Sequence, residues 1–473
     1  MSPETIALLI AGGILVGTVA FALYSVRRIK MDPQQYIVGG RSFGALFLWL
    51  LLAGEVYTSF TFLGAAGWAY GKGAPAFYIL AYGTIGYTIG YFYLPHVWRI
   101  GKERGLLTSP DFFQARYGSK VLTKSVAVLQ FVLIIPYVTL QLSGVQIILS
   151  IAGYGHYNAT VAVAVAFALI VIFTFTAGLH GAAWASIVKD ALVLGAVAFA
   201  GIVLPLHFFG SFGTMFDHVL AASPHWLTLR TGAAPQGMNW FISTVLLTSI
   251  GFYMGPHSIA AVYAARDGDT IRRNAIFLPL YQLVLLLVFI AGFTALVVTP
   301  GLKGPAVDQS FLLVVQQYYP AWVMGVIAGA GCLAALLPAS AQLLGASSVF
   351  AHNVLGEARW TRYFVIVIAI GAFFMWLNWN QTLVDLLLLY YNGITQFMPA
   401  FIFGIFWKRA NAWAVGSGIL AGEIVAFYLW HHSIDLAGIN PGFLALLVNV
   451  AVCVAVALMQ RHRQAQEIAV PAR

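Results

Sequence analysis

The stretch LLAGEVYTSFTFLGAAGWAY, residues 51–70, is apolar enough to cross a bilayer, yet its middle does not suit an ordinary membrane helix. A glycine precedes the acid Glu55, and the hydroxyls of Tyr57, Thr58 and Ser59 follow it. A charge at membrane depth is costly, so it is kept there for a reason. The pattern favours an unwound segment that coordinates a cation. The alternative is a protonated or paired Glu55 that only packs helices.

A second interruption is found in TSIGFYMGPHSIAAVY, residues 248–263. The pair Gly255 and Pro256 removes one backbone donor and sterically disrupts the preceding turn. His257 follows this pair and Tyr253 comes just before it. These residues predict a second broken helix with exposed backbone groups and a role in binding a solute. The alternative is a simple proline kink with a hydrogen-bonded structural histidine.

The composition indicates a membrane protein throughout the chain. Its 473 residues are 61% hydrophobic and only 8% charged, and the mean hydropathy is +0.86, whereas soluble proteins carry roughly 25% charged residues. Backbone groups in lipid must be satisfied within helices or closed barrels, and the long, non-alternating runs indicate helices. Thirteen apolar segments are predicted at about 5–26, 44–70, 76–100, 121–151, 158–179, 181–207, 238–263, 274–299, 321–352, 362–379, 381–407, 411–432 and 441–460.

The basic residues predict how these segments are oriented. With the N-terminus outside, twenty Lys and Arg residues fall in inside segments, and Lys72, Arg230 and Lys303 fall outside. This bias predicts an outside N-terminus and a cytoplasmic C-terminus in the plasma (inner) membrane. It also accounts for the net charge of +9 without nucleic acid. Cys332 and Cys453 lack the spacing of a metal site, and the first residues read as a retained span.

The two interrupted segments lie five segments apart, which is typical of an inverted-repeat transporter. We expect one integral membrane transporter domain over 1–473. Its first span, 5–26, is peripheral, and its repeats cover about 44–207 and 238–407. Extra spans follow at 411–460, with a short cytoplasmic tail at 461–473.

Five motifs in order resemble the sodium/solute symporter family over nearly the whole length. They are YIVGGRSFG, TFLGAAGWAYGKG, TSPDFFQARYGS, GPHSIAAVYAARD and QFMPAFIFGIFWKRANAWAVGSGILAG. The resemblance implies an all-α polytopic protein of about 13 transmembrane helices with the LeuT-type 5+5 inverted repeat core. The phrases GEVYTSFTFLG, GFYMGPH and AALLPAS look most like the branch of monocarboxylate permeases, whose members carry small acids such as lactate and pyruvate.

The resemblance also implies a sodium site, from which this chain departs. In relatives, backbone carbonyls of the first broken helix meet a pair of hydroxyls in the eighth core helix. The matching carbonyls belong to Ala53 and Val56, but the hydroxyl pair falls on two of the residues 337–339, which carry none. Ser340 is the nearby candidate, so the usual sodium site is in doubt.

The segment AAWASIVKDALVLGAVAFAG, residues 182–201, departs as well. Where many relatives have an acid and, three residues later, a glutamine, this chain has Ser186 and Lys189, one turn apart on one helix face. One reading places the Lys189 ammonium in the ion site, where it carries the coupling proton or replaces sodium. In the other, Lys189 stands about 12 Å beyond a turn at Gly181 and snorkels back to the cytoplasm, with Asp190 as an interfacial partner.

These observations predict a secondary transporter that couples a small solute, a monocarboxylate, to sodium or protons by alternating access. The alternative is a sodium-coupled symporter of amino acids such as proline or alanine. A channel or sensor fits less well, and an enzyme is not expected because no nucleophile–base or metal set is visible. We expect no cofactor and no nucleic acid; the partners are the solute, the coupling cation and membrane lipid. The candidate residues are Tyr57, Thr58, Tyr253, Pro256 and His257 for the solute, and Ala53, Glu55, Val56, Ser186, Lys189 and Ser340 for the ion.

Overall fold

The computed structural model describes residues 1–29, 32–54, 57–156 and 158–460, and helices make up most of this part of the chain. The α-helices are α1 (Pro3–Val26), α2 (Pro33–Val38), α3 (Ala45–Gly54), α4 (Ala65–Lys72), α5 (Tyr78–Glu103), α6 (Ser109–Tyr117), α7 (Lys120–Leu133), α8 (Ile135–Ala152), α9 (Ala159–Ala198), α10 (Leu204–Phe209), α11 (Phe212–Ala222), α12 (Met238–Gly251), α13 (Pro256–Ala264), α14 (Gly268–Gln282), α15 (Leu285–Val298), α16 (Ser310–Tyr318), α17 (Ala321–Asn353), α18 (Thr361–Asn378), α19 (Leu383–Ile394), α20 (Met398–Phe406), α21 (Ala412–His431) and α22 (Pro441–Met459). Shorter helices of other types are η1 (Gly39–Arg41), η2 (Phe60–Gly64), η3 (Ala74–Phe77), η4 (Phe199–Val203), η5 (Gly304–Gln309), η6 (Ala358–Trp360) and η7 (Thr395–Phe397).

The helices agree with the predicted spans. Within the described residues, nine helical runs are long and apolar enough to cross a membrane, and the bent pair α12 and α13 makes a tenth. The three other predicted segments are also helical in their described parts: α3 with α4, α5, and the first part of α9. The prediction of an all-helical membrane protein is therefore confirmed.

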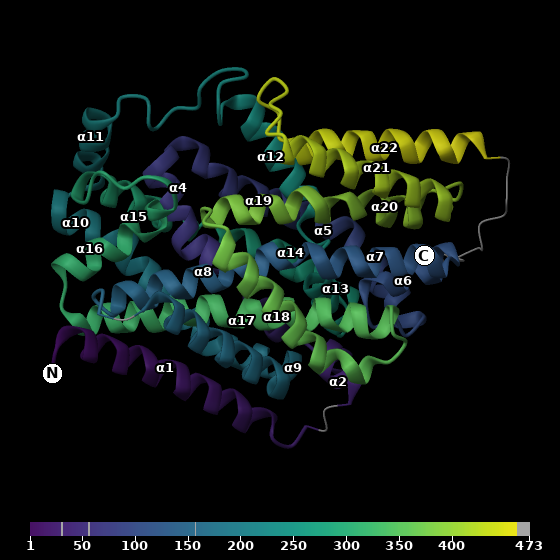
Figure 1. Cartoon of the computed structure of the whole chain (residues 1–473), viewed down its shortest axis with the longest axis horizontal. Coiled ribbons are helices and arrows are strands. Elements are labelled where there is room, and N and C mark those ends of the chain that lie inside the picture. The colour runs from purple at the N-terminus through teal and green to yellow at the C-terminus, as the bar shows by residue number, and fades with distance from the viewer. Residues whose placement is uncertain (30–31, 55–56, 157, 461–473) are drawn as a thin grey trace.

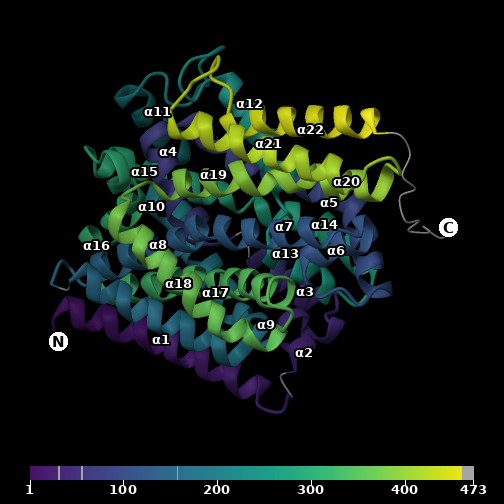
Figure 2. The same ribbon diagram turned by 45° about the vertical axis from the view of Figure 1, so that its right-hand side comes forward.

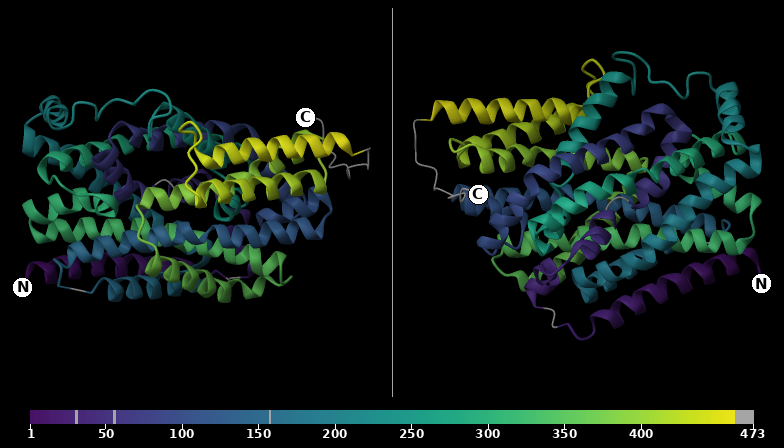
Figure 3. Two further views of the ribbon diagram at one scale, coloured as in Figure 1. Left: turned by 45° about the horizontal axis from the view of Figure 1, so that its top comes forward. Right: turned by 180° about the vertical axis from the view of Figure 1, so that it is seen from behind.

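The axes of most of the long helices are roughly parallel, and neighbouring helices such as α21 and α22 have opposite chain directions (Figure 1). The short helices α2 and α6 lie at one end of this bundle, and α10, α11 and α16 lie at the other, as Figures 1 and 2 both show. The helix α17 is the most enclosed of the candidate spans and packs beside α1, α8, α9 and α18. The hairpin of α21 and α22 forms one side of the bundle (Figure 3).

The sequence predicts the turn between the fifth and sixth segments at Gly181, but the structure places it three residues earlier. The helix α9 is bent at Gly178, which has a φ of 55° and a ψ of −160°. A β-carbon at Gly178 would meet the Tyr36 ring at 2.7 Å, so both the backbone and the packing require glycine there. Lys189 therefore stands eleven residues beyond the bend, which is about 16 Å along the helix rather than about 12 Å.

The first interrupted segment is broken where the sequence predicts it. The helix α3 ends at Gly54, and helical structure resumes with η2 at Phe60. The predicted ion ligands Glu55 and Val56 lie in this break, outside the described residues.

The second interrupted segment has a simpler geometry. The helix α12 ends at Gly251, α13 begins at Pro256, and the two are bent by 47°. Proline stands at the first position of α13, where its missing N–H removes no hydrogen bond. Because α13 packs beside α3, the two broken segments meet inside the bundle.

Candidate functional site

Backbone N–H groups at the first break donate to side-chain oxygens of its own threonines and of α8. The Thr58 N–H donates to Thr61 Oγ1 at 2.9 Å, and the Phe60 N–H donates to Thr58 Oγ1 at 3.2 Å. The Ser59 N–H donates to Gln141 Oε1 of α8 at 3.2 Å. The hydroxyl of the predicted solute residue Thr58 therefore accepts a backbone N–H where helical structure resumes. The amide side chain of Gln141 in α8 also contacts the break, and the sequence analysis did not single out this residue.

The second break buries an imidazole. His257 lies in the first turn of α13, is 4% exposed, and its Nδ1 has no hydrogen-bond partner within the described residues. The Tyr137 ring lies 5.8 Å from the imidazole and 4.8 Å from the Tyr390 ring. The Tyr390 hydroxyl lies 2.5 Å from the position of a β-carbon on Gly255. A helix N-terminus favours negative charge, and here aromatic and imidazole groups pack around it.

Two of the predicted solute residues pack elsewhere. The Tyr253 ring lies 2.6 Å from the position of a β-carbon on Gly90 and stacks at a tilt with Tyr87, both on α5. The Tyr57 ring packs edge-on against Tyr281 of α14 at 4.8 Å. The structure thus groups Pro256 and His257 at one break and places the two tyrosines against α5 and α14.

Lys189 is buried at the first break. Its side chain is 0% exposed, and its Nζ forms an ion pair of 2.9 Å with Asp190 Oδ1. The same Nζ lies 3.2 Å from the position of a β-carbon on Gly54, the last residue of α3, and Ser186 Oγ lies 3.6 Å from that position. The structure therefore places the ammonium beside the first break and not at the protein surface.

Among the described residues, the surroundings of Lys189 offer few ligands for sodium. The Ala53 carbonyl, a predicted ligand, accepts the Tyr57 N–H at 3.3 Å. Leu337, one of the three positions 337–339 at which the family resemblance implies a hydroxyl pair, lies in a small apolar cluster with Ala185 of α9. Ser340 is buried within α17. Because hard cations need several oxygen ligands, an ammonium and an alkyl side chain in these places do not fit a sodium ion.

The structure adds residues that sequence reasoning missed. Asp190 is buried with Lys189 instead of being interfacial, and the Tyr281 hydroxyl donates to Asp190 Oδ1 at 3.4 Å. The sequence could have pointed to Tyr281, because Tyr281 and Gln282 are polar side chains within a mostly apolar segment. Nothing in one sequence shows that Gln141 faces the first break.

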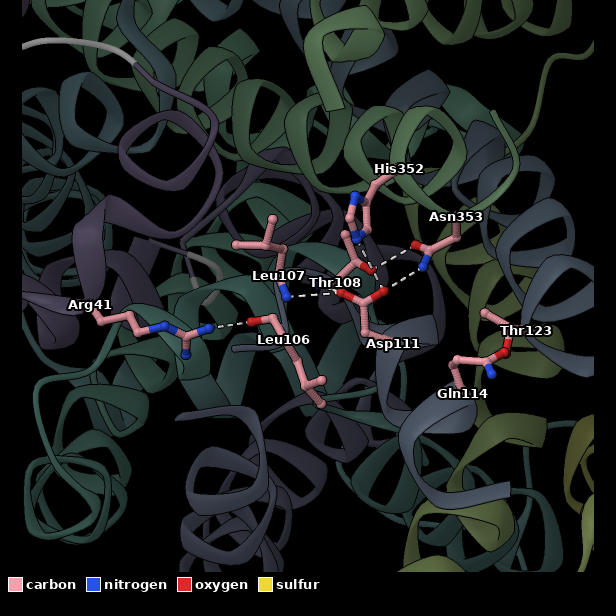
Figure 4. A network of polar contacts seen from close by, with 9 residues as sticks. All are labelled: Arg41, Leu106, Leu107, Thr108, Asp111, Gln114, Thr123, His352 and Asn353. Carbon is pink, nitrogen blue, oxygen red and sulfur yellow. Dashed lines mark hydrogen bonds and ion pairs between the residues drawn. The ribbon is translucent and has the colours of Figure 1, made fainter. Parts of the chain in front are cut away.

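A polar network joins α6 to α17 at one end of the bundle (Figure 4). The N–H groups of Leu107 and Thr108 donate to Asp111 Oδ2 at 2.9 and 3.0 Å, and Asn353 Nδ2 donates to Asp111 Oδ1 at 2.5 Å. His352 Nε2 lies 3.3 Å from the same Oδ1. Burial alone would raise the pKa of Asp111, but the hydrogen bonds and the charge of His352 hold it below its ordinary value.

The far end of α13 is fixed at the same face. Arg41 donates to the Leu106 carbonyl (Figure 4) and, at 3.5 Å, to the Tyr263 carbonyl. The Trp98 indole donates to the Ala265 carbonyl at 2.8 Å. The second broken segment is therefore tied to α5 and η1 at the end that the basic residues predict to be cytoplasmic.

Two broken helices that meet inside a helical bundle, with a buried charge at one break and a half-helix N-terminus at the other, define a secondary transporter. The chain belongs to the sodium:solute symporter family, because the sequence model of that family matches residues 36–425. It is 39% identical to the uncharacterized symporter YhjB of Bacillus subtilis (strain 168), over 96% of this chain and 97% of that protein. It is 29% identical to a monocarboxylate transport permease protein of Rhizobium johnstonii, over 89% of this chain and 90% of that protein.

The fold is similar to a solved transporter. A Na+-coupled sialic acid symporter in a substrate-bound outward-open state matches with a TM-score of 0.81, over 96% of this chain and 98% of that chain. The sequences are 18% identical, so the likeness concerns the fold alone. It confirms the predicted LeuT-type fold class. The protein is a membrane symporter and not an enzyme.

Proposed function

We propose that the protein is a proton-coupled symporter that carries small monocarboxylates across the plasma membrane. The observation that carries the proposal is the fully buried Lys189 ammonium beside Gly54, where relatives of this family are expected to hold sodium. A symporter moves its solute together with a coupling ion, and here a buried lysine lies beside the break where the ion site is expected.

The second break supports a carboxylate as the solute. The N-terminal end of α13 is positive, and His257 Nδ1 is buried without a partner among the described residues. The Tyr137 ring packs against the imidazole and against the Tyr390 ring, and such close packing favours a compact solute. The relative from Rhizobium johnstonii is named for monocarboxylate transport, which agrees with this chemistry.

The first break supports a proton as the coupling ion. Lys189 and Asp190 form a buried ion pair of 2.9 Å beside this break, and a buried carboxylate is a group that can gain and lose a proton. The hydroxyl pair expected for sodium is replaced by residues such as Leu337, which packs in an apolar cluster. A charged pair in the apolar interior is therefore the chemical feature through which a proton gradient can act.

The basic residues support an orientation for the protein in the membrane. We place the N-terminus outside and the α6 end of the bundle in the cytoplasm, because twenty Lys and Arg residues fall on that side of the predicted spans. The contacts of Asp111 and Arg41 then close the cytoplasmic side of the described structure.

The experiment that tests this function is uptake into proteoliposomes with the purified protein. An imposed proton gradient, sodium gradient or neither is combined with labelled pyruvate, lactate, acetate, alanine and proline. We expect an inward proton gradient to drive accumulation of pyruvate or lactate without sodium. A strict sodium requirement without a pH effect would refute proton coupling, and accumulation of alanine or proline in place of the acids would refute the proposed solute.

A further inference from the structure

We propose that Asp190, and not Lys189, takes up the transported proton, while the Lys189 ammonium stays charged throughout the cycle. The inference rests on the proton-coupled function proposed above, and it assigns the proton to an oxygen of the α9 ion pair. Four groups carry the argument: Lys189, Asp190, Tyr281 and Tyr57.

The ion pair has an unusual position. Lys189 and Asp190 are neighbours in sequence, and neighbouring side chains on a helix normally diverge. Here both are buried, at 0% and 5% side-chain exposure, and their charged atoms are 2.9 Å apart. Taking two charges out of water is costly unless further hydrogen bonds satisfy them. An ion pair that is kept despite this cost is expected to have a function other than stabilising the fold.

The pair is also incompletely satisfied. Within the described residues, Lys189 Nζ and Asp190 Oδ2 have no hydrogen-bond partner of good geometry. Asp190 Oδ1 receives the ion pair and the weak hydrogen bond from Tyr281 at 3.4 Å. An unpartnered carboxylate oxygen in an apolar interior is a ready acceptor for a proton, whereas the ammonium already holds all the protons that it can.

The proton step balances without any other reactant. A proton from the aqueous phase forms an O–H bond at Asp190 Oδ2, and the carboxylate becomes a neutral carboxylic acid. The attraction within the pair is lost, so the Lys189 charge loses the partner that the described residues give it, beside Gly54 at the first break. Release of the same proton on the other side restores the carboxylate and the ion pair. No charge leaves Lys189 in either direction.

Tyr281 connects this step to the first break. Its hydroxyl contacts Asp190, and its ring packs edge-on against Tyr57 and Trp49, each at 4.8 Å. Trp49 lies in α3 and Tyr57 lies within the break, so one ring touches both the break and the helix that precedes it. Within the described residues, the groups that act electrostatically on Asp190 are Lys189, Tyr281 and Tyr57. Through Tyr281, α14 therefore contacts both Asp190 and the broken helix.

The decisive variant is Lys189→Arg. A guanidinium is charged at every physiological pH, so it cannot carry a coupling proton, but it can act as a fixed cation. If Asp190 takes up the proton, Lys189→Arg keeps pH-dependent, proton-driven pyruvate uptake. If Lys189 takes it up, the variant loses proton-driven uptake and keeps pyruvate counterflow.

A second pair of variants makes the test independent of how well arginine fits. Asp190→Asn imitates the protonated acid, so we expect normal counterflow with no accumulation above equilibrium and no pH dependence. The matched control is Asp217→Asn, at an exposed position of α11, which should behave like the wild type. Tyr281→Phe removes a hydrogen bond that favours the ionised carboxylate, so the midpoint of pH-dependent uptake should move to higher pH.

The outcomes separate the two proposals. A wild-type protein that ignores the proton gradient contradicts the proposed function itself. A wild-type protein driven by protons, with an Asp190→Asn variant that keeps full proton-driven accumulation, overturns the assignment to Asp190 and leaves the function standing. Loss of counterflow in Lys189→Arg shows that arginine does not fit, and then Asp190→Asn and the Tyr281→Phe midpoint decide.

Discussion

The Lys189 Nζ lies 3.2 Å from the point where a β-carbon would stand on Gly54. At this point α9 contributes the Lys189 ammonium and α3 contributes the backbone of Gly54, so the two helices approach each other closely. This contact joins the broken helix to the buried ion pair, and it explains why a glycine precedes the break.

The first prediction concerns this contact. Gly54→Ala places a methyl group against the ammonium at 3.2 Å, so the ammonium must shift away from the first break. We expect proton-driven uptake to fall about tenfold, the equivalent of ~1.4 kcal/mol, in a folded protein. The control is Gly17→Ala in α1, where nothing lies within 4 Å of the added carbon. Equal uptake rates in both variants would show that the contact is not functional.

The second prediction concerns the solute. His257→Gln removes an imidazole whose Nδ1 lacks a partner among the described residues, at the positive end of α13. If this group contacts the carboxylate, the KM for pyruvate should rise about tenfold or more while the pH dependence of uptake stays unchanged. The exposed His218→Gln serves as the control. An unaltered KM in proteoliposomes would remove His257 from the solute site.

The third prediction concerns pH and a residue outside the spanning helices. Asp308 is 1% exposed, its Oδ2 accepts the Leu383 N–H at 2.8 Å, and its Oδ1 lies 2.5 Å from the position of a β-carbon on Gly67. Burial raises its pKa to about 7. A raised pKa means that the folded state prefers the neutral acid, so this stabilising contribution is present below about pH 4 and is lost as the pH rises to about 7.

The measurement is thermal unfolding in detergent at pH 5 and pH 8. The wild type should lose more stability between these values than Asp308→Asn, by the order of 1.4 kcal/mol for each pH unit within the window. Asp269→Asn, whose side chain is 77% exposed, should follow the wild type. If the pH dependence of Asp308→Asn matched that of the wild type, the buried acid would not be the titrating group.

The sequence predicts the fold well because apolar runs and helix-breaking residues are local signals. Gly54 at the end of α3 and Pro256 at the start of α13 mark the two breaks correctly. The bend of α9 was placed at Gly181 instead of Gly178, because both are glycines and only the packing of Tyr36 selects the latter.

The site was harder to predict because it depends on contacts between distant segments. Lys189 and Ser186 stand out in sequence, but whether the ammonium is buried or reaches the surface depends on how α3 packs against α9. The partnership of Asp190 with Tyr281 joins residues 91 positions apart, and no local pattern encodes it. Tyr253 looked like a solute residue from its neighbours, and its ring packs against α5.

The most direct test of the central claim is proton-driven uptake by the Lys189→Gln variant. Glutamine is similar in length but carries no charge to pair with Asp190, while Lys124→Gln changes an exposed lysine of α7 as the control. The account predicts that Lys189→Gln loses pyruvate accumulation driven by an inward proton gradient and retains pyruvate counterflow, with the control unaffected. Proton-driven accumulation by Lys189→Gln with unchanged pH dependence would contradict the claim that the buried lysine is part of the coupling site.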